Sequence, residues 1–120
     1  MNDLTMGVAE SRFADIIWDN EPISSSELVK RSNDLLQWKK STAFTVLKRL
    51  CNKGIFQNQN GVVSSLITRD EFYSAQSEQF VEETFNGSLP AFLAAFTSRK
   101  KLSDKEVEEI RKLIDEHKEG

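Results

Sequence analysis

The feature that most constrains the fold is the stretch from residue 55 to residue 63, where two apolar pairs enclose the segment Gln-Asn-Gln-Asn-Gly. Asn60-Gly61 between apolar residues is the strongest short-range signal for a β-hairpin, because both central residues of its tight turn need a positive φ. This hairpin follows three segments in which apolar residues recur at helical spacing. Three helices followed by a hairpin predict a winged helix-turn-helix, which we assign to residues 1–68.

A start or a stop signal marks each of the three helices of this domain. They are expected over residues 6–19, 24–35 and 41–53. Pro22 ends the first helix because it disfavours the helical conformation of the residue before it, and Ile23 is a short extended link. The second helix opens at Ser24, where Glu27 completes a capping box. Gly54 ends the third helix.

The second half of the chain predicts three further amphipathic helices, which open at Thr68, Ser88 and Ser103. A segment of this length buries little surface alone, because cores below about 40–60 residues are marginal. Its apolar faces either fold back on the first half or pair with a second copy, and we favour the second alternative. We therefore predict a mainly α protein whose residues 69–120 form a three-helix dimerisation region. The residues expected to pair are Phe72, Tyr73, Phe80, Phe85, Leu89, Phe92, Leu93, Phe96, Val107, Ile110 and Ile114.

Basic residues are concentrated in one short segment, although the net charge of the chain is −3. The window from residue 39 to residue 53 holds five basic residues and no acidic one. Lysines at the start of a helix oppose its dipole, whereas an approaching phosphate is attracted to that end. We interpret the third helix as a DNA-recognition helix, and the alternative explanation is a solvated charged face.

The polar face of this helix and the tip of the hairpin supply the residues expected to contact double-stranded DNA. Basic side chains neutralise phosphates and set affinity, while short hydroxyl side chains approach base edges. Phe44 leaves three interpretations open: contact with a thymine methyl group, packing, or altered base preference. The expected DNA-binding residues are Lys39, Lys40, Ser41, Thr42, Phe44, Thr45, Lys48, Arg49, Asn58 and Asn60.

Other classes of function lack their sequence signals. The single cysteine, Cys51, and the single histidine, His117, argue against a nucleophile pair or a metal site, and we interpret Cys51 as a small buried residue. Phosphate-binding glycine loops and hydrolase motifs are missing from the sequence, so we expect no enzyme activity and no cofactor. No apolar run reaches the roughly 20 residues of a membrane span, and no signal-peptide pattern opens the chain. A cytoplasmic location without membrane insertion is expected.

Several short stretches, none specific alone, match one family in their order. They lie at residues 16–18, 26–29, 38, 42, 45, 47, 49–50, 53–54, 85–96 and 102–103. Over nearly its full length the chain resembles the penicillinase-repressor (BlaI/MecI/CopY type) transcriptional regulators. The resemblance implies a homodimer with an N-terminal winged helix that represses transcription on a palindromic operator. It also implies relief, in many members, by a membrane sensor-protease that leads to repressor cleavage.

The chain departs from the family pattern in places that bear on function. Residues 39–42 are Lys-Lys-Ser-Thr where the family usually has Ser-Pro-Lys-Thr, and Phe44 stands where a basic residue is common. Residues 57–61 carry no charge, which predicts a weaker grip of the hairpin on the DNA backbone. The bond that matches the family's Asn-Phe cleavage bond is Ala95-Phe96. The C-terminal cysteine cluster of copper-responsive members has no counterpart.

The sequence therefore predicts a sequence-specific transcriptional repressor that acts as a homodimer on a palindromic operator. The alternative is a winged-helix protein–protein interaction module that lacks sequence-specific DNA recognition. Three features favour this alternative: the uncharged hairpin, the apolar Phe44, and an acidic second half, with seven basic against eleven acidic residues over residues 71–120.

Overall fold

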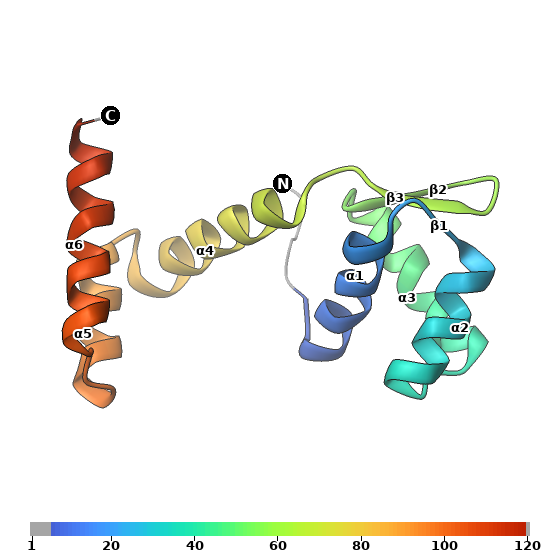
Figure 1. Ribbon diagram of the computed structural model, residues 1–120, viewed down its shortest axis with the longest axis horizontal. Helices are drawn as coiled ribbons and strands as arrows, with labels where there is room; N and C mark the ends of the chain where they lie inside the picture. Colours follow the sequence, from blue (N-terminus) through green and yellow to red (C-terminus); the bar gives the residue numbers. More distant parts are fainter. Residues whose placement is uncertain (1–5, 120) are drawn as a thin grey trace. The chain divides into compact units, whose positions relative to one another are not determined.

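The computed structural model describes residues 6–119 (Figure 1). In chain order its elements are α1 (Val8–Asn20), β1 (Ile23–Ser24), α2 (Ser25–Leu36), α3 (Lys40–Asn52), β2 (Phe56–Gln59), β3 (Val62–Ser65), α4 (Arg69–Phe85), α5 (Leu89–Arg99) and α6 (Asp104–Glu119). They form two compact units that divide between Gln79 and Phe80, within α4. The predicted fold class, a mainly α chain with an N-terminal winged helix and C-terminal helices, is confirmed.

The starts of α2, α4, α5 and α6 follow the capping signals of the sequence, whereas α1 and α3 have no side-chain cap. At α2 the Ser24 half of the predicted capping box forms, because the Ser24 hydroxyl accepts a hydrogen bond from the backbone N–H of Glu27 at 3.1 Å, while the Glu27 carboxylate pairs with Arg31. At α4 both bonds of a capping box form, because the N–H of Glu71 donates to Thr68 Oγ1 at 3.0 Å and the N–H of Thr68 donates to Glu71 Oε1 at 3.4 Å. Each bond satisfies an N–H group that has no partner inside the helix.

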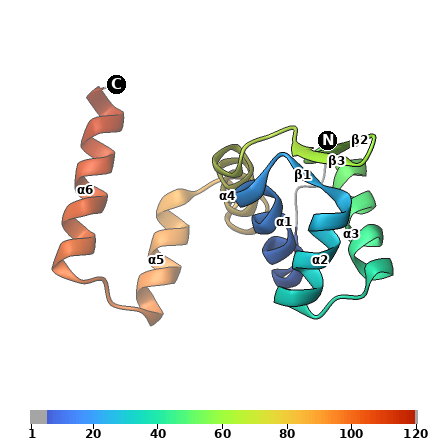
Figure 2. The same ribbon diagram turned by 45° about the vertical axis from the view of Figure 1, so that its right-hand side comes forward.

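A three-stranded antiparallel sheet in the order β1-β3-β2 lies across one end of α1, α2 and α3, as Figures 1 and 2 show. In the predicted hairpin, β2 pairs with β3 from Phe56 opposite Ser65 to Gln59 opposite Val62. The segment at Ile23, which we predicted as an extended link, is instead a strand that pairs with β3 opposite Val63. A two-residue strand is too short to show an alternating pattern in the sequence.

The core of the first unit joins the helices to the sheet. Its fully buried large side chains are Phe13, Ile17, Leu28, Leu50, Ile55, Phe56, Val63 and Phe72. Phe72 comes from α4, and its ring centroid lies 5.6 Å from that of Trp18 on α1. The prediction that Phe72 pairs with a second copy is therefore corrected, because its side chain is 0% exposed within its own chain. The first turns of α4 belong to the winged-helix unit, so the units divide later than the predicted boundary at residue 68.

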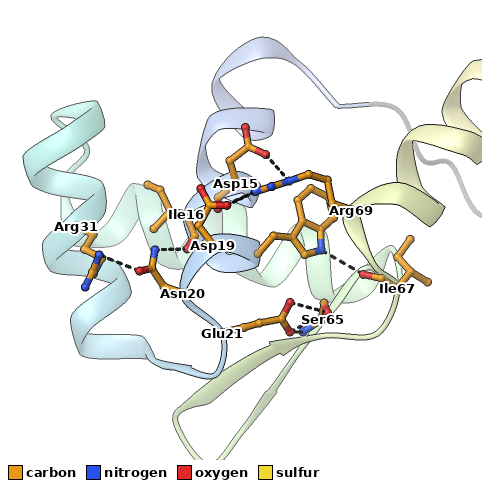
Figure 3. Close-up of polar contacts among 10 residues, drawn as sticks. Asp15, Ile16, Asp19, Asn20, Glu21, Arg31, Ser65, Ile67 and Arg69 are labelled. Atoms are coloured by element: carbon orange, nitrogen blue, oxygen red, sulfur yellow. Dashed lines mark hydrogen bonds and ion pairs between the residues drawn. The ribbon is translucent and has the colours of Figure 1, made fainter.

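Polar contacts also attach the start of α4 to α1 (Figure 3). The guanidinium of Arg69 donates to Asp19 Oδ1 at 2.6 Å, and its Nε lies 3.2 Å from Asp15 Oδ1. The same group lies 5.7 Å from the ring of Trp18, whose indole N–H donates to the carbonyl of Ile67 at 3.1 Å. The hydrogen bond to Asp19 raises the pKa of Arg69 further above its ordinary value. These contacts fix the segment between β3 and α4 against α1.

The second unit is formed by the end of α4 with α5 and α6. Four phenylalanine rings make consecutive contacts in it, with centroid distances of 5.6–6.2 Å; they are Phe80, Phe85, Phe92 and Phe96. Helix α6 opens with a complete capping box between Ser103 and Glu106. The backbone N–H of Ser103, which donates to the carboxylate, lowers the pKa of Glu106. None of the helices in the described part of the chain is long and apolar enough to cross a membrane.

Candidate nucleic-acid interface

Helix α3 has one buried face and one exposed face. Ala43, Val46, Leu47 and Leu50 are buried in the core of the first unit. Ser41, Thr45 and Lys48 follow one another at i, i+4 and i+7, so they share the opposite face, and all three are exposed. The predicted recognition helix therefore presents two hydroxyls and an ammonium group to the outside. The Thr45 hydroxyl also donates to the carbonyl of Ser41 at 2.9 Å, which fixes its orientation along the helix.

The N-terminus of α3 carries positive charge from two sources. Lys39 occupies the N-cap position and Lys40 the first helical position, and both side chains are exposed. A lysine side chain cannot accept hydrogen bonds from the first N–H groups of the helix, so these groups and the dipole add to the lysine charges. This combination attracts a phosphate. Thr42 follows in the first turn and is also exposed.

Phe44 lies on the side of α3 that faces the hairpin. A groove of about 350 Å³ separates helix and hairpin there, and it is lined by Phe44, Leu47, Lys48, Cys51 and Asn58. Phe44 is 37% exposed, and the Lys40 ammonium lies 5.9 Å from the centroid of its ring. The Phe44 side chain is therefore partly packed at the groove and partly exposed, and the three interpretations of this residue stay predictions.

The hairpin has the backbone that its sequence requires. Asn60 and Gly61 have φ values of 54° and 84°, and the Asn58 side chain accepts a hydrogen bond from the N–H of Gly61 at 3.0 Å. The carbonyl of Gly61 accepts from the N–H of Ser25 at 2.8 Å, so the tip is attached to the start of α2. Asn58 and Asn60 are exposed, but part of the hydrogen-bonding capacity of Asn58 serves the turn.

Arg49 lies on the side of α3 opposite to Phe44, and it has an intramolecular partner that sequence analysis missed. Its Nη1 donates to Glu10 Oε1 of α1 at 2.7 Å, and the two side chains are 49% and 21% exposed. The contact spans 39 residues, and no local pattern marks it in the sequence. Arg49 therefore joins α3 to α1, and its guanidinium is less available to DNA than the ammonium groups of Lys39, Lys40 and Lys48.

Cys51 lines the groove and is partly buried. Burial raises the pKa of its thiol above the ordinary value. Because the thiolate is the reactive form, the raised pKa disfavours nucleophilic and metal-binding chemistry at this residue. Within residues 6–119 no three His, Cys, Asp or Glu side chains are grouped closely enough to hold a metal ion.

Apart from the buried Phe72, the residues predicted to pair two copies differ in how exposed they are and in the unit to which they belong. Tyr73 is 41% exposed and packs against the rings of Trp18 and Phe72 in the first unit. The large side chains left most exposed in the second unit are Phe80 (49%), Leu89 (55%), Phe96 (42%), Leu113 (66%) and Ile114 (55%). The remaining predicted residues, Phe85, Phe92, Leu93, Val107 and Ile110, are half-buried. Leu113 was not in the predicted set, although it follows Ile110 at helical spacing.

The bond between Ala95 and Phe96 lies inside α5, and both residues are exposed. The i→i+4 backbone bonds of a helix hold such a peptide in a compact form. A protease that binds an extended substrate therefore needs local opening of α5 before it can reach this bond.

Comparison with known proteins shows which family the sequence matches. The sequence model of the family described as "Penicillinase repressor" matches residues 6–116, which include both units. The chain belongs to the penicillinase repressor family. Members of this family are transcriptional repressors, which are not a class of enzymes.

Individual members of the penicillinase repressor family align with nearly the whole chain. A penicillinase repressor of Bacillus licheniformis is 26% identical over 114 residues, which cover 92% of this chain and 89% of the relative. The methicillin resistance regulatory protein MecI of Staphylococcus aureus (strain Mu50) is 24% identical over 110 residues, with 88% and 89% covered. A penicillinase repressor of Staphylococcus aureus is 24% identical over 115 residues, with 92% and 91% covered.

Proposed function

We propose that this protein represses transcription by binding, as a homodimer, to a palindromic DNA operator. The observation that carries the proposal is the exposed face of α3, where Lys39, Lys40 and Lys48 surround a row of hydroxyl residues and acidic residues are missing from the helix. Ammonium groups bind phosphates independently of sequence, while hydroxyls reach base edges. A bound dimer represses by covering the promoter.

The exposed apolar side chains of the second unit support the homodimer. Several large apolar side chains exposed in one small unit are typical of an association site, and a second copy offers the same side chains in a two-fold arrangement. Two α3 helices related by a two-fold axis contact half-sites about one helical turn apart, roughly 10 bp or slightly more. The operator is therefore expected to be a palindrome.

A second candidate function is an interaction module that binds another protein through the α3 face. The hairpin carries no basic residue that could bind phosphate, and Phe44 exposes apolar surface on α3. These features suit a protein surface as well as DNA.

Selection from a random duplex DNA library tests the proposal directly. The full-length protein is mixed with the library, and the retained duplexes are sequenced. We expect an enriched motif with two-fold symmetry, because each subunit contacts the same half-site. A folded, dimeric protein that enriches no motif would contradict the proposal and favour the interaction module.

Replacing Lys48 with alanine is expected to weaken binding to all duplexes by a similar factor. Each lysine that neutralises a phosphate contributes nearly one unit to the slope of log K against log salt concentration. A homodimer loses two such contacts, so the slope should fall by about two. The measurement is the dissociation constant of the selected duplex at several salt concentrations.

Lys112→Ala is the matched control for Lys48→Ala, because it removes the same charge from an exposed position on α6. Its salt dependence should equal that of the unaltered protein. If Lys48→Ala also leaves the slope unchanged, Lys48 does not contact phosphate.

A further inference from the structure

Phe44 is an apolar side chain on the exposed part of a helix whose other exposed residues are polar. Between residues 41 and 49 of α3, the remaining exposed side chains carry hydroxyl or basic groups. Phe44 is 37% exposed, while Ala43 and Leu47 beside it are 1% and 3% exposed. An aromatic ring left in water contributes less to stability than one buried in the core. Its position therefore suits a contact with a molecule outside the chain.

The surroundings of the ring define the chemistry of that contact. Lys40, one turn before Phe44, holds its ammonium 5.9 Å from the ring centroid. Leu47 and Cys51 continue the groove beside the ring, and burial raises the pKa of the Cys51 thiol. This side of α3 thus offers carbon and sulfur atoms next to lysine ammonium groups that can hold a phosphate backbone.

Only one base presents a purely apolar group in the major groove of DNA. Thymine carries a 5-methyl group there, whereas the other groups at the base edges are hydrogen-bond donors and acceptors. We propose that Phe44 recognises a thymine in each half-site through its 5-methyl group. This inference rests on the proposed function and adds to it one residue that determines base specificity.

Uracil substitution tests the inference, because uracil differs from thymine only by the missing methyl group and pairs with adenine in the same way. In the selected duplex, each thymine is replaced by uracil in turn, at the equivalent positions of both half-sites. Burial of one methyl group corresponds to about a fourfold change in affinity, so two half-sites give a loss of about fifteenfold at one position. The measurement is the ratio of the dissociation constants of the uracil and thymine duplexes for the full-length protein.

Phe44→Ala should bring this ratio close to one, because the variant has no ring to contact the methyl group. Since Phe44 is partly exposed, the fold should persist, and thermal unfolding checks this. Lys39→Ala is the control: it removes a phosphate contact, so it should weaken both duplexes and leave the ratio unchanged.

Three results would overturn the inference. A motif bound equally well with uracil and with thymine at every position excludes methyl recognition but leaves the proposed repressor function intact. A ratio that persists in Phe44→Ala assigns the methyl contact to another residue, such as Thr42 or Thr45. No enriched motif at all overturns both the inference and the proposed function.

Discussion

Replacement of Phe72 with alanine is expected to lower the free energy of unfolding of the winged-helix unit by about 3–5 kcal/mol. Phe72 is 0% exposed, and its ring packs against Trp18 at a centroid distance of 5.6 Å. Truncation removes this buried apolar surface and leaves a cavity between α1 and α4 that the surrounding backbone cannot fully close. A loss of this size is a large fraction of the stability of a small domain.

Urea unfolding followed by tryptophan fluorescence measures the effect of Phe72→Ala, since the two tryptophans, Trp18 and Trp38, both lie in the first unit. Tyr73→Ala is the matched control: it removes a neighbouring ring that is 41% exposed, so it should cost about 1 kcal/mol. Association of two chains should be unaffected by Phe72→Ala at concentrations where the unit is folded. A variant that keeps its stability but loses self-association would return Phe72 to the dimer interface.

Local signals explain why so much of the fold was predictable from the sequence. The starts of α2, α4, α5 and α6 depend on side-chain caps within one turn, as the complete capping box between Thr68 and Glu71 shows. Helices α1 and α3 start without such a cap. The hairpin likewise depends on the two turn residues, Asn60 and Gly61, whose positive φ values the sequence predicts. In these places local preference and tertiary structure agree.

Contacts between distant parts of the chain explain what sequence analysis missed. The pairing of Ile23 with Val63 and the bond between Arg49 and Glu10 each join segments about 40 residues apart. Phe72 shows the same limit in another form. Helical spacing predicts that Phe72 lies on the apolar face of its helix. Spacing does not say whether this face packs against its own chain or against a second copy. The ion pair of Arg49 was not predicted for the same reason, because its partner lies on α1, and its contact with DNA stays a prediction.

Replacement of Phe96 with aspartate is expected to raise the dissociation constant of the proposed homodimer by at least about a hundredfold. Phe96 is 42% exposed on α5, so the change should cost a single chain little. In a two-fold dimer the substitution occurs twice, and burial of an unpaired carboxylate costs more than the 1.4 kcal/mol that corresponds to a tenfold change. Sedimentation equilibrium over a range of protein concentrations measures the dissociation constant.

Ser98→Asp is the control for Phe96→Asp, because it introduces the same charge at an exposed polar position on the same helix. It should associate like the unaltered protein.

Phe96 lies outside the winged-helix unit, so the monomeric Phe96→Asp variant should keep the tryptophan fluorescence of a folded first unit and bind a single half-site. Its affinity for the full palindrome should fall, because two linked half-site contacts become independent events. Unchanged self-association of Phe96→Asp would instead show that α5 does not form the interface, and the apolar side chains of α6 would then be the place to seek it.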